Sequence, residues 1–202
     1  VTQKNSERRK IRVRTADVKH LKQEFSLLKD IYNKAWEKNW GFIPFAPREL
    51  DQMVHEIGQF FDPRMAFFAE VEGVPRAFLL GLPDMNQALR HAYPRPGKPD
   101  WISLLQLLWH WKVRSKIDRV RVMLMGIEDG YRTIGIDAAL FIEAYNTGHK
   151  LGWQHGDGGW VLETNGPMNR LAQALNGRIY KTYRVYERAL APQPAGQKGE
   201  QA

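Results

Sequence analysis

The sequence contains no cysteine, which excludes disulfide bonds, thiolate metal sites and a cysteine nucleophile. It also lacks any run of about 18 uncharged apolar residues, the length that a membrane-spanning helix needs. No HExxH motif occurs, and the 6 histidines show no metal-binding spacing with carboxylates. A serine-centred nucleophile elbow is missing as well. These absences predict a protein with no metal site and no covalent intermediate on cysteine or serine.

The first ten residues are polar and basic, without the apolar segment of a signal peptide, which favours a cytoplasmic location. The chain does not start with Met, which indicates truncation or processing. A length of 202 residues with 43% hydrophobic residues favours one globular domain with a sizeable core. The net charge of +8 suits an anionic partner, which could be nucleic acid, a lipid surface or a phosphorylated cofactor.

A strand, a glycine turn and a helix follow one another in residues 119–145. Residues 119–125 (RVRVMLM) predict a buried strand, and the glycines of residues 126–130 predict a turn. From Ile134 onward, apolar side chains recur at helical spacing. A helix that begins after such a turn has several backbone N–H groups without partners, and its dipole adds positive potential. The sequence therefore predicts an anion site at the start of this helix.

The motif Arg132-x-x-Gly135-x-Asp137, placed after a hydrophobic strand, resembles the signature of the GNAT acyltransferase superfamily. The resemblance extends from about residue 11 to residue 188 and includes a later segment with Asn, Met and Leu at every third position, 165–171. It implies an α/β (α+β) GNAT fold. Such a fold would have a mixed central sheet of about six strands flanked by helices, with an extra helix between strands 3 and 4.

The remaining segments supply the elements of such a fold in the order β-α-α-β-β-excursion-β-α-β-α-β. The expected strands are 11–14, 65–71, 75–82, 119–125, 160–163 and 178–188, and the expected helices are 17–37, one from Pro47, 101–116, 134–145 and 167–175. The domain organisation predicted from composition is a flexible basic N-terminus at 1–10, a single domain at 11–190 and a disordered tail at 191–202.

The resemblance implies that acetyl-CoA, or another acyl-CoA, binds along the central strand and the turn. The backbone of Met125 and Ile127 would pair with the pantetheine and the acyl carbonyl, and the loop amides would meet the pyrophosphate. The implied cofactor-binding residues are Met125, Ile127, Arg132, Thr133, Ile134, Gly135, Ile136, Asp137, Asn165 and Asn169. For Gly135 an alternative reading is close packing of the helix against the sheet.

Asp137 departs from the family pattern, which has Gly or Ala at that position. A carboxylate in the first turn of a helix is favourable by about 0.3–1 kcal/mol. The same carboxylate close to a pyrophosphate would be repelled by about 1–4 kcal/mol at 4 Å, depending on the dielectric. We therefore expect Asp137 to point away from the ligand, to stabilise the helix start or to pair with Arg132.

The usual catalytic groups of the family are missing, because Ala172 and Arg121 stand where a tyrosine and a carboxylate are expected. The substitutes that the sequence offers are Glu163, Asp84 and Tyr183, each of which also has a structural reading as a capping, edge or rim residue. A loop rich in aromatic residues, expected at 36–47, would border the acceptor site. It would line an apolar or cation-binding pocket there, or close the core. The substrate-binding residues predicted in and beyond this loop are Trp36, Asn39, Trp40, Phe42 and Asn86.

The sequence thus predicts an N-acyltransferase that moves an acetyl group from acetyl-CoA to an amine by direct attack. The acceptor would be a small-molecule or peptide amine, with no specific nucleic acid and no membrane insertion, and a homodimer is left open. One alternative is a catalytically degenerate GNAT-like module that binds acyl-CoA or a protein partner. A nucleic-acid-binding domain is a further alternative, motivated by the +8 charge and by aromatic residues between basic ones in 180–184.

Overall fold

The computed structural model describes residues 11–37, 42–44, 46, 48–49, 52, 62–97, 99–114 and 117–188. Its contacts group into two units, residues 1–165 and residues 166–202. The expected N-terminal arm at 1–10, the tail at 191–202 and most of the helix expected from Pro47 lie outside the described residues. The prediction of one domain over 11–190 stays a prediction.

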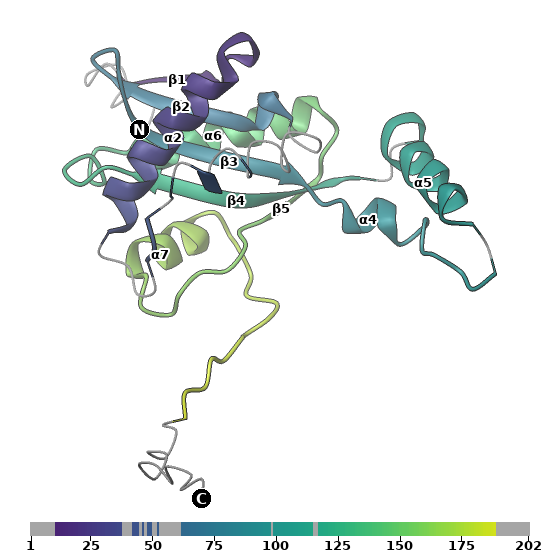
Figure 1. Ribbon diagram of the computed structural model, residues 1–202. Helices are drawn as coiled ribbons and strands as arrows, with labels where there is room; N and C mark the ends of the chain where they lie inside the picture. Colours follow the sequence, from purple (N-terminus) through teal and green to yellow (C-terminus); the bar gives the residue numbers. More distant parts are fainter. Residues whose placement is uncertain are drawn as a thin grey trace, which may run out of the picture. The chain divides into compact units, whose positions relative to one another are not determined.

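The first unit is built on a mixed five-stranded sheet in the order β1-β2-β3-β4-β5 (Figure 1). Its strands are β1 (Ile11–Thr15), β2 (Ala66–Val71), β3 (Val74–Pro83), β4 (Arg119–Ile127) and β5 (His155–Asp157). Strands β1 to β4 are antiparallel, and β5 joins β4 in parallel. The β2–β3 hairpin turns at Glu72 and Gly73, whose φ angles of 54° and 81° are those of the tight turns that match strand twist. The α/β GNAT fold class is confirmed.

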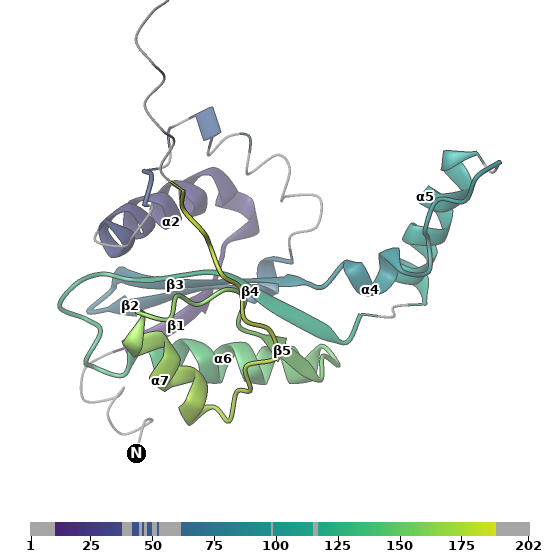
Figure 2. The ribbon, with the colours of Figure 1, turned by 90° about the horizontal axis from the view of Figure 1, so that it is seen from below.

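Two helices cover opposite faces of this sheet, α2 (Leu21–Trp36) and α6 (Ile136–Lys150) (Figure 2). Because side chains alternate along a strand, Phe68 and Phe78 pack with the core beneath α2, whereas Phe67 and Leu79 pack with α6. Both faces of β2 and β3 are therefore buried. This explains why their sequences are almost continuously apolar.

The helix α2 begins after a 3-10 turn, η1 (Val18–His20), at which the Asp17 carboxylate accepts a hydrogen bond from the Lys19 N–H at 2.8 Å. Asp17 thus caps this 3-10 turn, at the start of the helical segment expected from residue 17. A second 3-10 turn, η2 (Pro63–Met65), leads into β2. Between β3 and β4 lie α4 (Asn86–Leu89), α5 (Asp100–Leu108) and the π-helical turn η3 (Trp109–Val113). The expected extra helix is confirmed, and Figures 1 and 2 show α5 beyond the end of the sheet.

The structure corrects two expected strands. Residues 160–163 are not a strand, and β5 lies earlier, in the segment expected to be a connection. The strand ends at Asp157 because the next two residues are glycines, and Gly159 takes a φ of 70°. Residues 178–188 are also not a strand and are exposed. Their alternating pattern could form a strand only beside a partner, which the pattern does not specify. The sheet has five strands where about six were expected.

The second unit contains α7 (Gly166–Ala174). The helix ends at Asn176, which has a φ of 58°, and the Gly177 N–H donates to the Ala172 carbonyl at 2.8 Å. The predicted stop at Asn176 and Gly177 is confirmed, because a left-handed residue after the last turn satisfies the terminal carbonyls. Among the described residues of both units, no helix combines the length and the hydropathy needed to cross a bilayer.

One buried carboxylate, Glu128, connects three elements of the first unit. It follows β4 directly and accepts hydrogen bonds from Lys34 Nζ of α2 at 2.9 Å and from Arg76 Nη1 of β3 at 2.8 Å. Burial alone would raise its pKa, but the hydrogen bonds and charges of the two cations outweigh burial, and the pKa of Glu128 is lowered. The pair of contacts holds the end of β4 beneath the C-terminal half of α2.

We expect Glu128→Gln to lower the free energy of unfolding by roughly 1–3 kcal/mol at pH 7, because two cations lose their charged partner. A carboxylate whose pKa is lower in the folded protein stabilises it above its unfolded pKa of about 4.5. This contribution is lost as the pH falls through the folded pKa. The difference in melting temperature between wild type and variant should therefore shrink below pH 4.5. The exposed Asp30→Asn on α2 is the control, and an equal loss in both variants would remove Glu128 from this role.

Candidate active site

The edge of β4 that faces β5 is open over most of its length. β5 pairs with β4 only at Arg119, Val120 and Arg121, and beyond Arg121 no other described strand occupies that side. On the opposite side β4 pairs with β3 as far as Ile127. The register to β3 shifts next to the open edge, so that Met123 is an extra residue on β4. Such a bulge twists a strand and re-aims its backbone, and it is frequent beside active sites.

An ion pair between a buried carboxylate and a partly exposed arginine marks the point at which β5 leaves β4. Asp157, whose side chain is 5% exposed, accepts hydrogen bonds from Arg121 Nη2 at 2.7 Å and Nε at 3.2 Å. Its second oxygen accepts from the Gly159 N–H at 2.9 Å, which bends the chain directly after β5. A Cβ on Gly159 would lie 3.0 Å from the Val122 carbonyl oxygen, so the segment after β5 is in contact with β4 at this point. Asp157 thus fixes where the open edge begins.

The backbone of Met125 and Ile127 points toward the open edge. The Glu128 N–H donates to the Arg76 carbonyl of β3 at 2.9 Å, and antiparallel pairs alternate between inward and outward groups. The outward carbonyls are accordingly met by side chains from elsewhere, namely Trp36 Nε1 at Met125 (3.0 Å) and Arg132 Nε at Ile127 (3.3 Å). The N–H groups of the same two residues lie along this edge.

The loop after β4 ends in a glycine that the backbone requires. Gly135 precedes α6 with a φ of 84°, in the left-handed region that other residues enter only with strain. A Cβ at this position would meet nothing within 4 Å, so the alternative reading of close packing is not supported. The Ala139 N–H donates to the Gly135 carbonyl at 3.1 Å. The preceding N–H groups of the helix, at residues 136–138, have no acceptor within the helix and point out of its end.

Arg132 braces this loop against α2. Its Nη2 donates to the Ala35 carbonyl at 2.7 Å and lies 3.3 Å from the Asp129 carboxylate. The expected pairing of Arg132 with Asp137 is therefore wrong, because the turn brings Asp129 to the guanidinium. Asp137 itself is half-buried in the first turn of α6. A cation at the C-terminal end of α2 is also favoured by the helix dipole.

The aromatic end of α2 lies beside the open edge. Trp36 stacks on Tyr32 with ring centres 5.0 Å apart, and Phe42 lies 5.7 Å from the same tyrosine ring. The structure thus brings Trp36, expected to bind substrate, to Met125, expected to bind the acyl-CoA. The other residues expected in this loop, Asn39 and Trp40, lie outside the described part of the chain.

The three expected catalytic side chains belong to different segments of the chain. Asp84 directly follows β3, beside the start of β4, and its carboxylate accepts from the Asn86 N–H at 3.2 Å and Nδ2 at 2.9 Å in a local turn. Glu163 is exposed in a turn after β5, and Tyr183 belongs to the second unit. Their roles stay predictions.

The two asparagines expected to bind the cofactor are divided between the units. The Asn165 N–H donates to the Leu162 carbonyl at 2.9 Å, at the end of the first unit. Asn169 lies on α7, in the second unit. Their roles also stay predictions.

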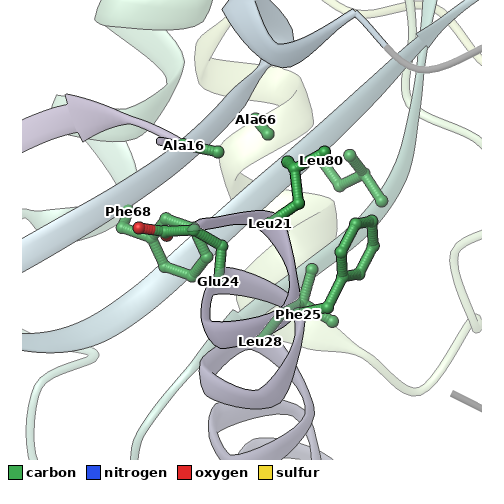
Figure 3. A pocket seen from close by; sticks show the side chains of 8 residues that line it. All are labelled: Ala16, Leu21, Glu24, Phe25, Leu28, Ala66, Phe68 and Leu80. Atoms are coloured by element: carbon green, nitrogen blue, oxygen red, sulfur yellow. The ribbon is translucent and has the colours of Figure 1, made fainter. Parts of the chain in front are cut away.

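A cavity of about 10 Å³ lies between α2 and the sheet (Figure 3). It has room for about one water molecule, so it is a packing gap and not a substrate pocket. Its walls are apolar apart from Glu24, which pairs with Arg14 at 2.9 Å. The described residues also contain no cluster of three or more His, Asp or Glu side chains that could hold a metal ion.

Sequence reasoning did not identify Asp157 and Glu128. Both carboxylates lie in segments expected to be connections, and each acquires its role through cations from other elements. The one available signal was the pair of arginines in RVR at the start of β4. A half-buried strand that carries charges on one side needs partners of opposite charge.

No family model matches this sequence. Two curated proteins are similar to it: Protein YghO of Escherichia coli, 33% identical over 189 residues, and Bacterial ceramide synthase of Caulobacter vibrioides, 32% identical over 182 residues. The alignments cover 91% and 88% of this chain but only 47% and 46% of those proteins. The chain thus spans about half the length of these relatives.

Solved structures share the fold at low sequence identity. The aminoglycoside acetyltransferase AAC(6')-Iy, in complex with a bisubstrate analogue of CoA, has a TM-score of 0.55 at 15% identity over 89% of this chain and 99% of its own. A possible acetyltransferase from Clostridium difficile has a TM-score of 0.51 at 16% identity, over 90% of this chain and 98% of its own. With the open edge of β4 and the helix start that follows it, these likenesses identify the fold: this chain has the fold of the GNAT acetyltransferases.

Proposed function

We propose that this chain is an acyl-CoA-dependent N-acyltransferase. The observation that carries the proposal is the open edge of β4, which leads directly to the N-terminus of α6. A strand edge offers N–H and C=O groups to an extended ligand with amide groups, as the pantetheine arm of CoA is. A helix N-terminus offers N–H groups and positive potential to phosphates. One cosubstrate, acyl-CoA, has both parts in this order.

The cations near the end of β4 would contribute less than the backbone to phosphate binding. Lys34 and Arg76 are engaged by Glu128, and Arg132 is engaged by Asp129 and two carbonyls. The pyrophosphate would therefore meet backbone N–H groups in residues 132–137, as the family resemblance implies. The roles that the resemblance implies for Asn165, at the end of the first unit, and for Asn169, in the second unit, stay predictions.

The reaction would be a direct transfer. The lone pair of a neutral amine attacks the thioester carbonyl carbon, and the carbonyl oxygen becomes an oxyanion that the N–H groups of the β4 edge stabilise. The intermediate collapses to the amide, the C–S bond breaks and CoA leaves as a thiolate. The amine loses one proton, and the thiolate takes up one. Glu163, Asp84 and Tyr183 are the candidates for these proton transfers.

The name of one relative points to the class of acceptor. A ceramide is the amide of a fatty acid with a long-chain amino alcohol, so a ceramide synthase forms an amide bond from an amine. By analogy, the acceptor here would be an amine attached to an apolar body, and the acyl group could be longer than acetyl. Trp36 and Phe42, which flank Tyr32, would provide an apolar wall for such an acceptor.

The non-catalytic alternative rests on the sequence, in which Ala172 and Arg121 stand where the family has its usual tyrosine and carboxylate. Isothermal titration with acetyl-CoA and palmitoyl-CoA, followed by release of free CoA thiol in the presence of a long-chain amino alcohol, distinguishes the two. Binding with acceptor-dependent thiol release supports the enzyme. Binding without release for any amine tested would leave an acyl-CoA-binding module, and no binding would refute both.

We expect Gly135→Glu to abolish acyl-CoA binding, because the new carboxylate would stand at the anion site. The substitution also places a side chain at a φ of 84°, which costs about 1–2 kcal/mol of stability. Gly73→Glu is a matched control, since Gly73 has a φ of 81°, open space around its Cβ and a place at the tip of the β2–β3 hairpin. Both variants should lose similar stability, and only Gly135→Glu should lose the calorimetric signal. Equal affinities would move the site elsewhere.

Asp157→Asn tests the point at which the strands separate. The amide oxygen can still accept from Gly159, but the charge that holds Arg121 is lost. We expect a loss of roughly 1–3 kcal/mol in stability, because a partly buried arginine loses its partner. Acyl-CoA affinity should fall as well, at temperatures where the variant remains folded by circular dichroism. Unchanged affinity in the folded variant would show that the separation of β5 from β4 does not depend on the ion pair of Asp157 and Arg121.

Asp137→Ala separates the two roles considered for this carboxylate. Since Asp137 lies in the first turn of α6, we expect the variant to lose about 0.3–1 kcal/mol of stability with unchanged or slightly weaker acyl-CoA binding. The measurements are a melting curve and calorimetry at two salt concentrations. Tighter binding that weakens with salt, at unchanged stability, would place the carboxylate against the pyrophosphate instead.

A further inference from the structure

The helix α5 and the turn η3 expose an apolar face that nothing in the described part of the chain covers. Trp101, Leu104, Leu105 and Leu108 are between 40% and 60% exposed. Their spacing of i, i+3, i+4 and i+7 places them on one side of the helix. No side chain of α5 or η3 is fully buried. Apolar faces of this kind on folded proteins mark interaction sites.

The opposite side of the same excursion is held in place. Ile102, Leu107 and Trp111 are half-buried, and the rings of His91 and His110 lie 4.7 Å apart. The Arg114 N–H donates to the Trp109 carbonyl at 2.8 Å, which closes the π-helical turn. The excursion is therefore an ordered element with an apolar outer face, and Figures 1 and 2 show α5 beyond the end of the sheet.

Positive charge is concentrated around this face. Residues 84–116 carry six Lys and Arg against two Asp, a net charge of +4 out of the +8 of the whole chain. The described cations are all exposed: Arg90, Arg95, Lys112 and Arg114. Lys112 Nζ lies 3.9 Å from the centre of the Trp111 ring, so a cation and an amphipathic aromatic adjoin each other. Of the two acids, Asp84 is occupied as a cap at Asn86.

Three exposed aromatic residues of residues 84–116 are of the kind that prefer a membrane–water boundary. Tyr93, Trp101 and Trp109 are 77%, 60% and 53% exposed. Tyrosine and tryptophan combine an apolar body with a polar tip and gather at the headgroup level of bilayers. Leucines between them would reach the acyl-chain boundary, and lysine and arginine would contact anionic headgroups. Protein interfaces, in contrast, are depleted in lysine.

We propose that the face formed by α5 and η3 docks this protein on the surface of an anionic phospholipid membrane. The helix would lie in the interface plane, which agrees with the finding that no described helix is suited to span a bilayer. The proposal rests on the exposed side chains and the charge of residues 84–116 and does not depend on the proposed reaction. If both hold, docking would bring the enzyme to amines and acyl chains that reside in lipid.

The test is co-sedimentation of the 202-residue chain with vesicles of phosphatidylcholine alone or mixed equally with phosphatidylglycerol. We expect binding to the mixed vesicles that weakens with salt, and little binding to phosphatidylcholine. The double variant Leu104→Glu/Leu105→Glu should bind the mixed vesicles at least about tenfold more weakly. Both side chains are exposed, so the variant should keep the circular dichroism spectrum and melting temperature of the wild type.

Two further variants separate apolar from electrostatic contributions. Ile142→Glu/Tyr145→Glu on α6 adds the same charge at exposed apolar positions outside the face and should change binding by no more than about twofold. Lys112→Gln/Arg114→Gln should weaken binding to the mixed vesicles by about fivefold for each cation removed. Acetyl-CoA calorimetry on the Leu104/Leu105 variant should match the wild type, which separates this test from the proposed function.

Three results would overturn the proposal. The first is no binding of the wild type to mixed vesicles at low salt, and the second is equal binding of the Leu104/Leu105 variant. The third combines two results. The wild type does not bind vesicles, and the Leu104/Leu105 variant loses either a dimer seen by analytical ultracentrifugation or binding to a single-stranded oligonucleotide. The face would then be a subunit or nucleic-acid interface.

Discussion

The candidate site depends on how far β4 is paired on each side. β4 pairs with β3 along almost its whole length but with β5 over only three residues. A central strand normally has its backbone groups satisfied on both sides, and leaving them open has a cost that a neighbour must offset. Asp157 enforces the separation by holding Arg121 and the Gly159 N–H together. The side chains of Trp36 and Arg132 then satisfy the outward carbonyls of β4 and leave its N–H groups along the open edge.

The same end of the molecule is braced by contacts to α2. Glu128 binds a lysine of α2 and an arginine of β3, and Arg132 donates to the Ala35 carbonyl near the end of the helix. Gly126 of β4 adds a steric condition, because a Cβ there would come within 2.6 Å of Phe78 and 3.3 Å of Ala35. The lack of a side chain at this glycine therefore lets Ala35 of α2 lie close to β4. Rigid positioning of this kind is what a site needs when backbone groups, and not a reactive side chain, carry most of the chemistry.

The strand edge proposed to bind acyl-CoA and the face proposed to dock on a membrane lie in different parts of the first unit. The open edge and α6 would bind the acyl-CoA, whereas the excursion between β3 and β4 presents the apolar and basic face. The chain spans about half the length of its curated relatives. The docking face would be useful to any reaction on a lipid substrate, because a reaction confined to a surface gains from local concentration.

The sequence by itself determined which apolar segments form strands and which form helices. The apolar hairpin of β2 and β3, the helical start at Asp17 and the end of α7 at Asn176 each follow from local chemistry: side-chain periodicity, a carboxylate that can cap, and a residue that accepts a positive φ. These predictions succeeded where the information lies within a few residues of the feature. The expected role of Met125 and Ile127 in acyl-CoA binding stays a prediction.

Tertiary structure alone decided the length of β5, the absence of a strand at 178–188 and the partners of the charged groups. Arg132 met Asp129 and not Asp137 because the geometry of the turn, and not the motif, sets which carboxylate is within reach. Asp157 and Glu128 received their cations from residues 36 to 94 positions away. Strand pairing and buried ion pairs join segments whose separation in sequence carries no periodic signal, so their roles appear only when the sheet brings those segments together.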